Sequence, residues 1–135
     1  MTITHDETLP LRTPEDIVRV RQQVRSWAIA IGFGLVDQTK IVTAASELAR
    51  NTIDYGGGGE ARLLRIADTG RTGLRIVFED RGPGISDVEL ALRDGYTTGS
   101  GLGLGLSGAR RLSNEFDIHT VPGEGTRITI TRWKG

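Results

Sequence analysis

Cysteine is absent from this chain of 135 residues, which excludes both a disulfide framework and a thiolate metal site. There are only two histidines, His5 and His119, and they are too far apart in the sequence to suggest a metal cluster. No charge predominates, because 17 basic side chains balance 17 acidic ones. A general nucleic-acid-binding protein would show a basic excess, so we expect no nucleic-acid partner.

Long hydrophobic runs are also lacking. No segment approaches the roughly 20 apolar residues that span a bilayer, so we expect no membrane partner. The first eleven residues include Asp6 and Glu7 and have neither the cationic start nor the apolar stretch of a secretory signal. The composition therefore predicts a soluble cytoplasmic protein. Neither a repeat nor a linker divides the chain, so residues 1–135 are expected to form one domain with its own core.

Glycine, in contrast, is abundant, at 19 of 135 residues against a usual share of about 7%. The glycines gather around positions 56–59, 82–84 and 99–108. Clusters of this kind between patterned segments indicate a backbone that approaches another group closely or adopts positive φ.

Two amphipathic helices are predicted in the first half of the chain. Thr13 followed by Pro14 is typical of a helix start, and apolar residues then recur every three or four positions until Gly32. A second helix is predicted over residues 37–55, and the glycines at 56–59 end it.

The rest of the pattern predicts strands and two further helices. Strands are expected over residues 8–11, 63–67, 74–79, 116–121 and 126–133, a short helix over 87–93, a loop over 94–103 and a helix over 104–114. Helices and mostly antiparallel strands in this order predict an α+β fold, specifically a two-layer α/β sandwich.

Glu47 and Asn51 lie four residues apart on the second predicted helix, a spacing that puts both side chains on one face. Asn offers a neutral oxygen to Mg²⁺, and Glu can orient or deprotonate an attacking hydroxyl group. The same spacing is common on solvated helix faces, so the pair alone does not identify a site.

Asp80 continues the inward-facing alternation of the strand predicted at 74–79. A buried acid is costly unless it has a partner, and the amino group of adenine is a suitable hydrogen-bond donor. Gly82 and Gly84 then allow a tight turn and leave room for a flat ring. An Asp-Gly turn that merely ends the strand would explain the same residues.

A glycine-rich run, Gly-Leu-Gly-Leu-Gly, precedes the helix predicted at 104–114. Its backbone N–H groups and the helix N-terminus favour an anion such as phosphate. Gly103, Gly105 and Gly108 also fit the dinucleotide fingerprint G-x-G-x-x-G, but that fingerprint follows a strand directly and here it follows a loop. The chain has no Gly-Lys-Ser/Thr, which excludes a P-loop.

In this order the motifs resemble the GHKL (Bergerat) ATPase superfamily, which includes gyrase B, Hsp90 and histidine kinases. The order is Glu-x-x-x-Asn on a helix, Asp-x-Gly-x-Gly after a strand, Gly-x-Gly-x-Gly before a helix, and Gly-Thr at a strand. The segments at 46–51, 79–85, 94–103 and 123–126 are similar to the RsbT type of bacterial switch kinase, a relative of the RsbW and SpoIIAB anti-sigma factors.

The resemblance implies that the chain binds ATP together with Mg²⁺. It makes Glu47 the catalytic general base and Asn51 the Mg²⁺ ligand. It makes Asp80 the acceptor for the adenine amino group, with Thr126 nearby and acting through water. Arg50, one position from Asn51 but on another side of the helix, is expected to make surface contacts.

The resemblance also implies how the rest of the nucleotide is held. Gly82 and Gly84 would shape the adenine pocket, Ile85 would pack on the ring, and residues 94–100 would form a lid. Backbone contacts to the nucleotide are implied for Gly101, Leu102, Gly103, Leu104 and Gly105.

Members of the RsbT type phosphorylate a STAS-domain antagonist and, once released, bind and activate a PP2C-type phosphatase. The resemblance therefore implies an ATP-dependent serine/threonine protein kinase of a partner-switching module. Related anti-sigma kinases dimerise, which leaves a homodimer open. Two alternatives are an RsbW-type anti-sigma factor that sequesters a sigma factor and a nucleotide-gated binding module without catalysis. A detached histidine-kinase domain fits less well, because Glu47 stands where those kinases often carry Asn.

Overall fold

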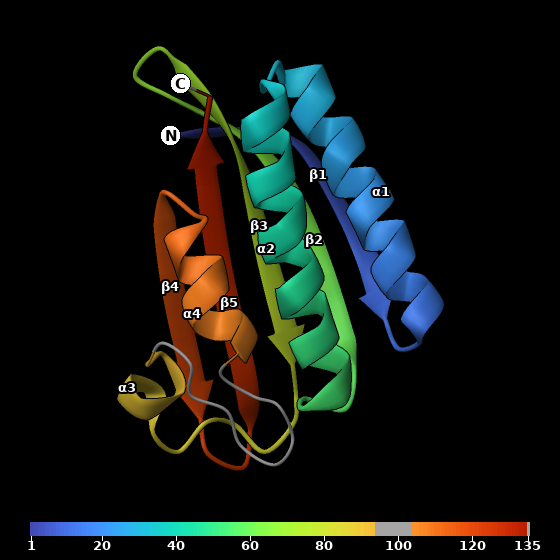
Figure 1. Ribbon diagram of the computed structural model, residues 1–135, viewed down its shortest axis with the longest axis vertical. Helices are drawn as coiled ribbons and strands as arrows, with labels where there is room; N and C mark the ends of the chain where they lie inside the picture. The colour runs from blue at the N-terminus through green and yellow to red at the C-terminus, as the bar shows by residue number, and fades with distance from the viewer. Residues whose placement is uncertain (94–103, 135) are drawn as a thin grey trace.

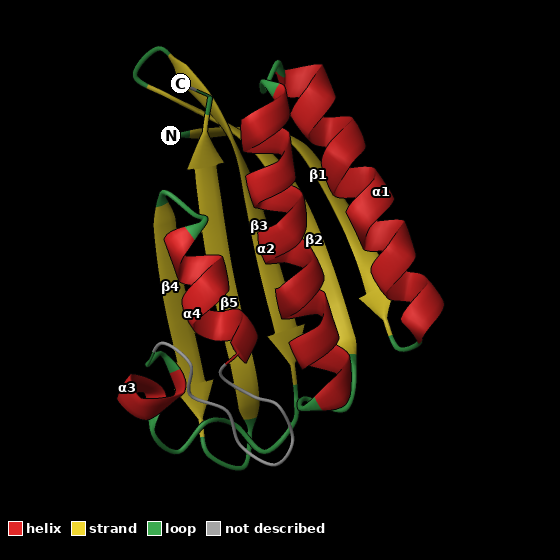
Figure 2. Ribbon diagram, in the orientation of Figure 1, coloured by secondary structure: helices red, strands yellow, loops and turns green. Residues whose placement is uncertain are grey.

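The computed structural model of the protein describes residues 1–93 and 104–134 (Figure 1). A five-stranded antiparallel sheet has the order β1-β2-β3-β5-β4, and α1, α2 and α4 cover one of its faces (Figures 1 and 2). The elements are β1 (Thr2–Leu11), α1 (Pro14–Ile31), α2 (Leu35–Asp54), β2 (Gly59–Asp68), β3 (Arg71–Asp80), α3 (Val88–Ala91), α4 (Leu104–Arg111), β4 (Glu115–Val121) and β5 (Gly125–Trp133). The two-layer α+β sandwich predicted from the sequence is confirmed.

Helix α1 begins and ends where the sequence predicts. Thr13 is its N-cap, and the carboxylate of Asp16 accepts hydrogen bonds from the backbone N–H groups of Arg12 (2.9 Å) and Thr13 (3.1 Å). These bonds hold the pKa of Asp16 below its ordinary value, and the bond from Arg12 has the largest effect. The helix ends at Gly32, whose φ of 103° is in the left-handed region that glycine tolerates.

Helix α2 lies over the middle of the sheet and carries the polar residues of the candidate site. It begins at Leu35, two residues earlier than predicted, because the carbonyl of Gly34 already accepts the Gln38 N–H at 2.9 Å. Its sheet-facing side is fully or nearly fully buried at Ile41, Ala44, Ala45, Leu48 and Ala49.

The hairpin between β2 and β3 fixes the end of the sheet at which Asp80 lies. Its two turn residues, Thr69 and Gly70, have φ values of 46° and 82°, a combination that suits the twist of paired strands. From Asp68↔Arg71 the register runs without a break to Gly59↔Asp80. The turn therefore places Asp80 opposite Gly59, the first residue of β2, which follows α2 after a short connection.

Strand β1 starts at Thr2, six residues earlier than predicted. Its first half is exposed and has no apolar alternation, so the sequence pattern gives no signal there. Backbone pairing with β2, from Thr2↔Ala67 onward, forms this part of the strand.

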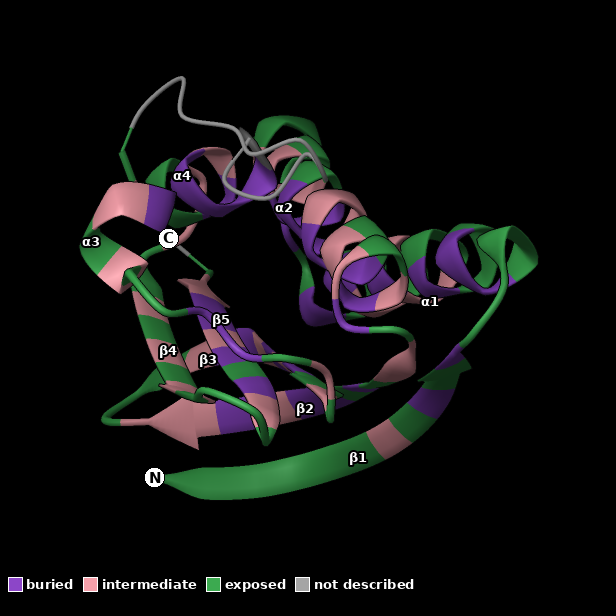
Figure 3. Ribbon diagram, turned by 90° about the horizontal axis from the view of Figure 1, so that it is seen from below, coloured by how far each residue is buried: buried purple, intermediate pink, exposed green. Residues whose placement is uncertain are grey.

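The core fills the space between the helices and the inner face of the sheet, and Figure 3 shows the buried residues along that boundary. Its largest fully buried side chains include Phe78, Leu11, Ile41, Leu48, Leu63, Leu74, Ile76, Leu106 and Ile130. Within the described residues, no helix combines the length and the hydropathy needed to cross a membrane.

Candidate functional site

Three polar residues form a row across neighbouring strands at one end of the sheet. Asp80 on β3 pairs with Thr126 on β5, and Thr126 pairs with Thr120 on β4. Each continues the inward-facing alternation of its strand, so the row faces the helices. Thr126 is buried and its hydroxyl oxygen lies 2.9 Å from that of Thr120.

The Asp80 carboxylate is half-buried and already holds two backbone donors. Oδ1 accepts the Gly82 N–H at 2.9 Å, and the Thr126 N–H also donates to the carboxylate. Burial raises the pKa of Asp80, and the two N–H donors oppose this shift without cancelling it. A carboxylate has about four acceptor positions, so this one keeps capacity for a further donor such as an exocyclic amine.

Glycines surround Asp80 because chain segments meet there without room for side chains. A Cβ on Gly56 would overlap the Asp80 carboxyl group, and one on Gly82 would lie 2.7 Å from the Gly56 carbonyl oxygen. A Cβ on Gly125 would overlap the Asp80 carbonyl oxygen. Gly84 has a φ of 76°, so the predicted turn after β3 does use positive φ.

Glu47 and Asn51 lie on the face of α2 that meets the start of α4. A Cβ on Gly105, the second residue of α4, would lie 3.0 Å from Asn51 Nδ2 and 3.2 Å from Glu47 Oε2. Glu47 also forms an ion pair with Arg50, whose Nη1 is 3.7 Å from Glu47 Oε1. The side chain of Arg50 is about half exposed, which agrees with the predicted surface contact.

Asn51 carries an unpaired buried polar atom. Its Nδ2 is buried and has no hydrogen-bond partner among the described residues. Because the nitrogen and oxygen of an amide exchange places by a simple flip, the same position can present an oxygen. A buried amide without a partner fits a ligand of a hard cation such as Mg²⁺.

No cluster of three or more His, Cys, Asp or Glu side chains in the described residues could hold a metal ion. Mg²⁺ is commonly bound through one or two protein groups together with substrate phosphates. A site built on Asn51 would therefore depend on the nucleotide for most of its remaining ligands.

A cavity beneath α2 lies between Asn51 and the pair Asp80 and Thr126, and Glu47 is not part of its lining. Its lining consists of Leu48, Asn51, Thr52, Tyr55, Phe78, Asp80, Ile85, Leu106, Thr126 and Ile128. The structure thus brings Asn51, Asp80, Ile85 and Thr126 together, as the sequence predicts. The cavity has a volume of about 10 Å³, room for one water molecule at most. An adenine ring therefore requires the surrounding side chains to separate.

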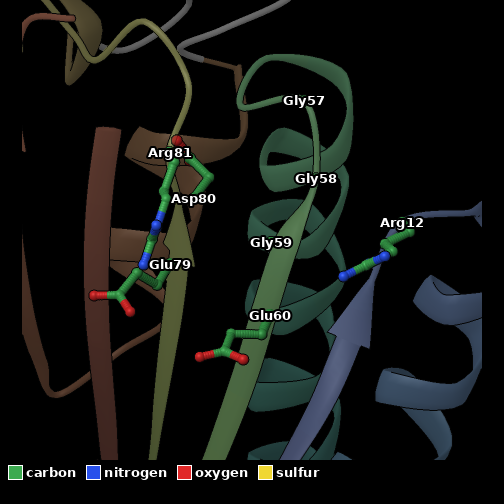
Figure 4. Close-up of a pocket in the computed structure, with 8 residues that line it drawn as sticks. All are labelled: Arg12, Gly57, Gly58, Gly59, Glu60, Glu79, Asp80 and Arg81. Carbon is green, nitrogen blue, oxygen red and sulfur yellow. The ribbon is translucent and has the colours of Figure 1, made fainter. Parts of the chain in front are cut away.

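A larger cavity, of about 510 Å³, lies behind Asp80 on the side that the helices do not cover (Figure 4). Its lining is Arg12, Gly57, Gly58, Gly59, Glu60, Glu79, Asp80 and Arg81. Asp80 is the one residue it shares with the predicted site. Size alone therefore does not identify the site that Glu47 and Asn51 define.

Part of the predicted phosphate cradle lies outside the described residues. Gly101, Leu102 and Gly103 belong to that part, as does the predicted lid at 94–100. Leu104 is the first residue of α4, and Gly105 follows it in the helix.

Sequence reasoning missed three residues that shape the site. Gly56 was attributed to the end of α2, although the structure packs it against Asp80. Tyr55 donates its hydroxyl hydrogen to the Gly84 carbonyl at 3.1 Å. Thr120 bonds to Ile85 and Thr126. Of the three, only Thr120 could have been found from the sequence pattern, because it continues the inward-facing alternation of the strand predicted at 116–121.

Comparison with known proteins identifies the family of this chain. The family model of histidine kinase-, DNA gyrase B- and HSP90-like ATPases matches residues 36–134. The chain is 48% identical to the serine/threonine-protein kinase RsbT of Bacillus subtilis (strain 168), over 91% of this chain and 92% of that protein. It is 28% identical to the anti-sigma F factor of Thermoanaerobacter sp. (strain X514), over 85% of this chain and 83% of the factor.

A solved structure shares the fold. The RsbU and RsbW domains of a Mycobacterium tuberculosis protein align with a TM-score of 0.62 and 24% identity, covering 96% of this chain and 32% of that one. The chain therefore belongs to the histidine kinase-, DNA gyrase B- and HSP90-like ATPases, and within them to the RsbT group of serine/threonine-protein kinases. As a protein kinase of an ATPase family, it uses ATP.

Proposed function

We propose that this kinase phosphorylates a serine or threonine of a STAS-domain antagonist in a bacterial partner-switching module. Once released from that antagonist, it binds and activates a PP2C-type phosphatase. The observation that carries the proposal is the meeting of Glu47 and Asn51 with Gly105, at one end of the cavity that Asp80 and Thr126 line. Its relation to RsbT, at 48% identity, supports the choice of partners.

The catalytic roles follow from the chemistry of these side chains. Glu47 accepts the proton of the substrate hydroxyl as the hydroxyl oxygen bonds to the γ-phosphorus of ATP, and the bond from that phosphorus to the β–γ bridging oxygen breaks to leave ADP. Asn51 would hold Mg²⁺, and the ion would supply neutralisation of phosphate charge. Phosphoryl transfer depends mainly on positioning and charge neutralisation, so a rigid α2 is a suitable platform.

Base recognition is assigned to the other end of the cavity. Asp80 accepts a hydrogen bond from the adenine amino group, with Thr126 beside it acting through water. Gly82 and Gly84 let the chain after β3 turn away from the ring, and the buried side chain of Ile85 packs on the ring.

A phosphotransfer assay tests the proposal. The purified kinase is incubated with γ-labelled ATP, Mg²⁺ and each STAS-domain protein of the same genome. We expect label on one of them, and a loss of about 10²–10⁴-fold with Glu47→Gln, the range that general-base catalysis supplies. Glu60→Gln, an exposed carboxylate on β2, is the matched control and should keep the wild-type rate.

The relation to anti-sigma factors supports a second candidate. A protein of that kind would co-purify with a sigma factor, and adding it to a PP2C-type phosphatase would leave phosphatase activity unchanged. That result would favour the anti-sigma function over the switch-kinase function. Absence of label transfer in the phosphotransfer assay, combined with ATP-dependent partner binding, would indicate a nucleotide-gated binding module. The switch-kinase proposal also requires cytoplasmic ATP and therefore a cytoplasmic location.

A further inference from the structure

One peptide unit in the wall of the cavity is held at both ends by hydroxyl groups. The carbonyl of Gly84 accepts the hydroxyl hydrogen of Tyr55 at 3.1 Å. The N–H of the same peptide, which belongs to Ile85, donates to Thr120 Oγ1 at 2.8 Å. Tyr55 follows the end of α2 and Thr120 lies on β4. The peptide is therefore hydrogen-bonded to the helix layer on one side and to the sheet on the other.

The hydroxyl group of Thr120 has no spare capacity. It accepts from the Ile85 N–H, donates to the Gly125 carbonyl at 3.1 Å, and lies 2.9 Å from Thr126 Oγ1. A hydroxyl has one hydrogen and two lone pairs, which these three partners use completely. Its orientation is therefore fixed, and so is the position of the Thr126 hydroxyl relative to the Gly84–Ile85 peptide.

Thr120 does not itself line the cavity, whereas Ile85 and Thr126 do. Both are at least nine-tenths buried, so their positions depend on the groups behind them. Thr120 therefore acts on the width and polarity of the cavity through its hydrogen bonds to Ile85 and Thr126.

We propose that the hydroxyl groups of Tyr55 and Thr120 are positioning groups for the nucleobase: together they clamp the Gly84–Ile85 peptide and set the affinity of the pocket for the base. This inference rests on the proposed adenine site and adds two residues to it. Neither hydroxyl is assigned a part in phosphoryl transfer. Their loss should therefore change nucleotide affinity and KM but leave kcat unchanged.

Isothermal titration with adenosine, ADP and ATP tests the proposal, with Tyr55→Phe and Thr120→Val as variants. We expect each to weaken all three ligands by a similar factor of about 3 to 10, the effect of one neutral hydrogen bond. Thr120→Ser keeps the hydroxyl and should restore wild-type affinity. The control is Thr129→Val, on the outer face of β5 and outside this cavity.

The outcomes separate this inference from the proposed function. Wild-type affinity in both Tyr55→Phe and Thr120→Val would overturn the clamp and leave the ATP site standing. A fall in kcat with unchanged KM would also overturn it, because that pattern indicates a catalytic or a general structural effect. If the wild-type protein bound none of the three ligands, the proposed function itself would fail. If Thr120→Val does not fold, Tyr55→Phe decides, because it removes only an oxygen atom.

Discussion

Gly105 on α4 lies directly against Asn51 on α2, so close that a Cβ on the glycine would be 3.0 Å from the amide nitrogen. The same Cβ would lie 3.0 Å from Glu47 Cβ. The first turn of α4 therefore contacts the two side chains to which catalysis is assigned. Their access to a nucleotide depends on where α4 sits relative to α2.

Replacing Gly105 should separate the two helices. We expect Gly105→Ala to lower the free energy of unfolding by about 1–3 kcal/mol, the usual range for overpacking, and to reduce phosphotransfer. Gly108→Ala is the matched control, because a Cβ there meets nothing within 4 Å. It should raise stability by about 0.5–1 kcal/mol through helix propensity. Urea unfolding of both variants and of the wild type checks this. A Gly105→Ala variant as stable as Gly108→Ala would contradict the contact.

Asn51→Ala should separate activity from stability. The variant removes a buried amide nitrogen that has no partner among the described residues. Burying such a group costs free energy, and removing that cost offsets the packing that the variant loses. We expect a change of less than about 1 kcal/mol in the free energy of unfolding but no detectable phosphotransfer. Thermal unfolding and the labelled-ATP assay give the two readings. Phosphotransfer at the wild-type rate would remove Asn51 from the site.

Gly56→Ala should displace the side chain of Asp80, because the added Cβ would overlap its carboxyl group. We expect loss of ATP binding and a stability decrease of about 1–3 kcal/mol. Titration calorimetry with ATP provides the measurement, and Gly108→Ala again serves as the control for an added methyl group. Unchanged ATP affinity would show that Asp80 does not contact the base.

Asp80 should give the unliganded protein a measurable pH dependence. Burial raises its folded-state pKa above the ordinary value of 3.8, so between these two pKa values the folded state binds the proton more tightly than the unfolded state does. The contribution of Asp80 to stability therefore falls as pH rises through that window and is constant above it.

The comparison of wild type with Asp80→Asn isolates this effect. The free energy of unfolding of the wild type minus that of the variant should decrease as pH rises from about 4 and then level off. Urea unfolding at a series of pH values without nucleotide provides the data. A difference that increases with pH would mean that the two backbone donors outweigh burial.

Much of the fold could be predicted because its signals are local. The N-cap at Thr13, the period of three to four along α1, and the stop at Gly32 each depend on residues close in sequence. The first half of β1 could not be predicted, because only its pairing with β2 makes it a strand. The predicted start of α2 was two residues too late, because a glycine N-cap gives a weaker sequence signal than a polar side chain.

The candidate site, like the fold, has some features that the local sequence predicts and others that depend on tertiary contacts. Spacing alone puts Glu47 and Asn51 on one helix face, and alternation alone turns Asp80 inward. The fit of Gly105 against α2 and of Gly56 against Asp80 depends on contacts between segments far apart in sequence. The single-domain organisation, the homodimer and the separate role of each site residue stay predictions.

By itself the sequence determined which residues face inward and in which order the motifs occur, because helical and strand periods are properties of neighbouring residues. Only the tertiary structure decided that the Gly84–Ile85 peptide is clamped between Tyr55 and Thr120, and that the cavity is closed to the size of one water molecule. Both depend on how tightly the helix layer packs on the sheet, and packing distances across layers have no signature in local sequence.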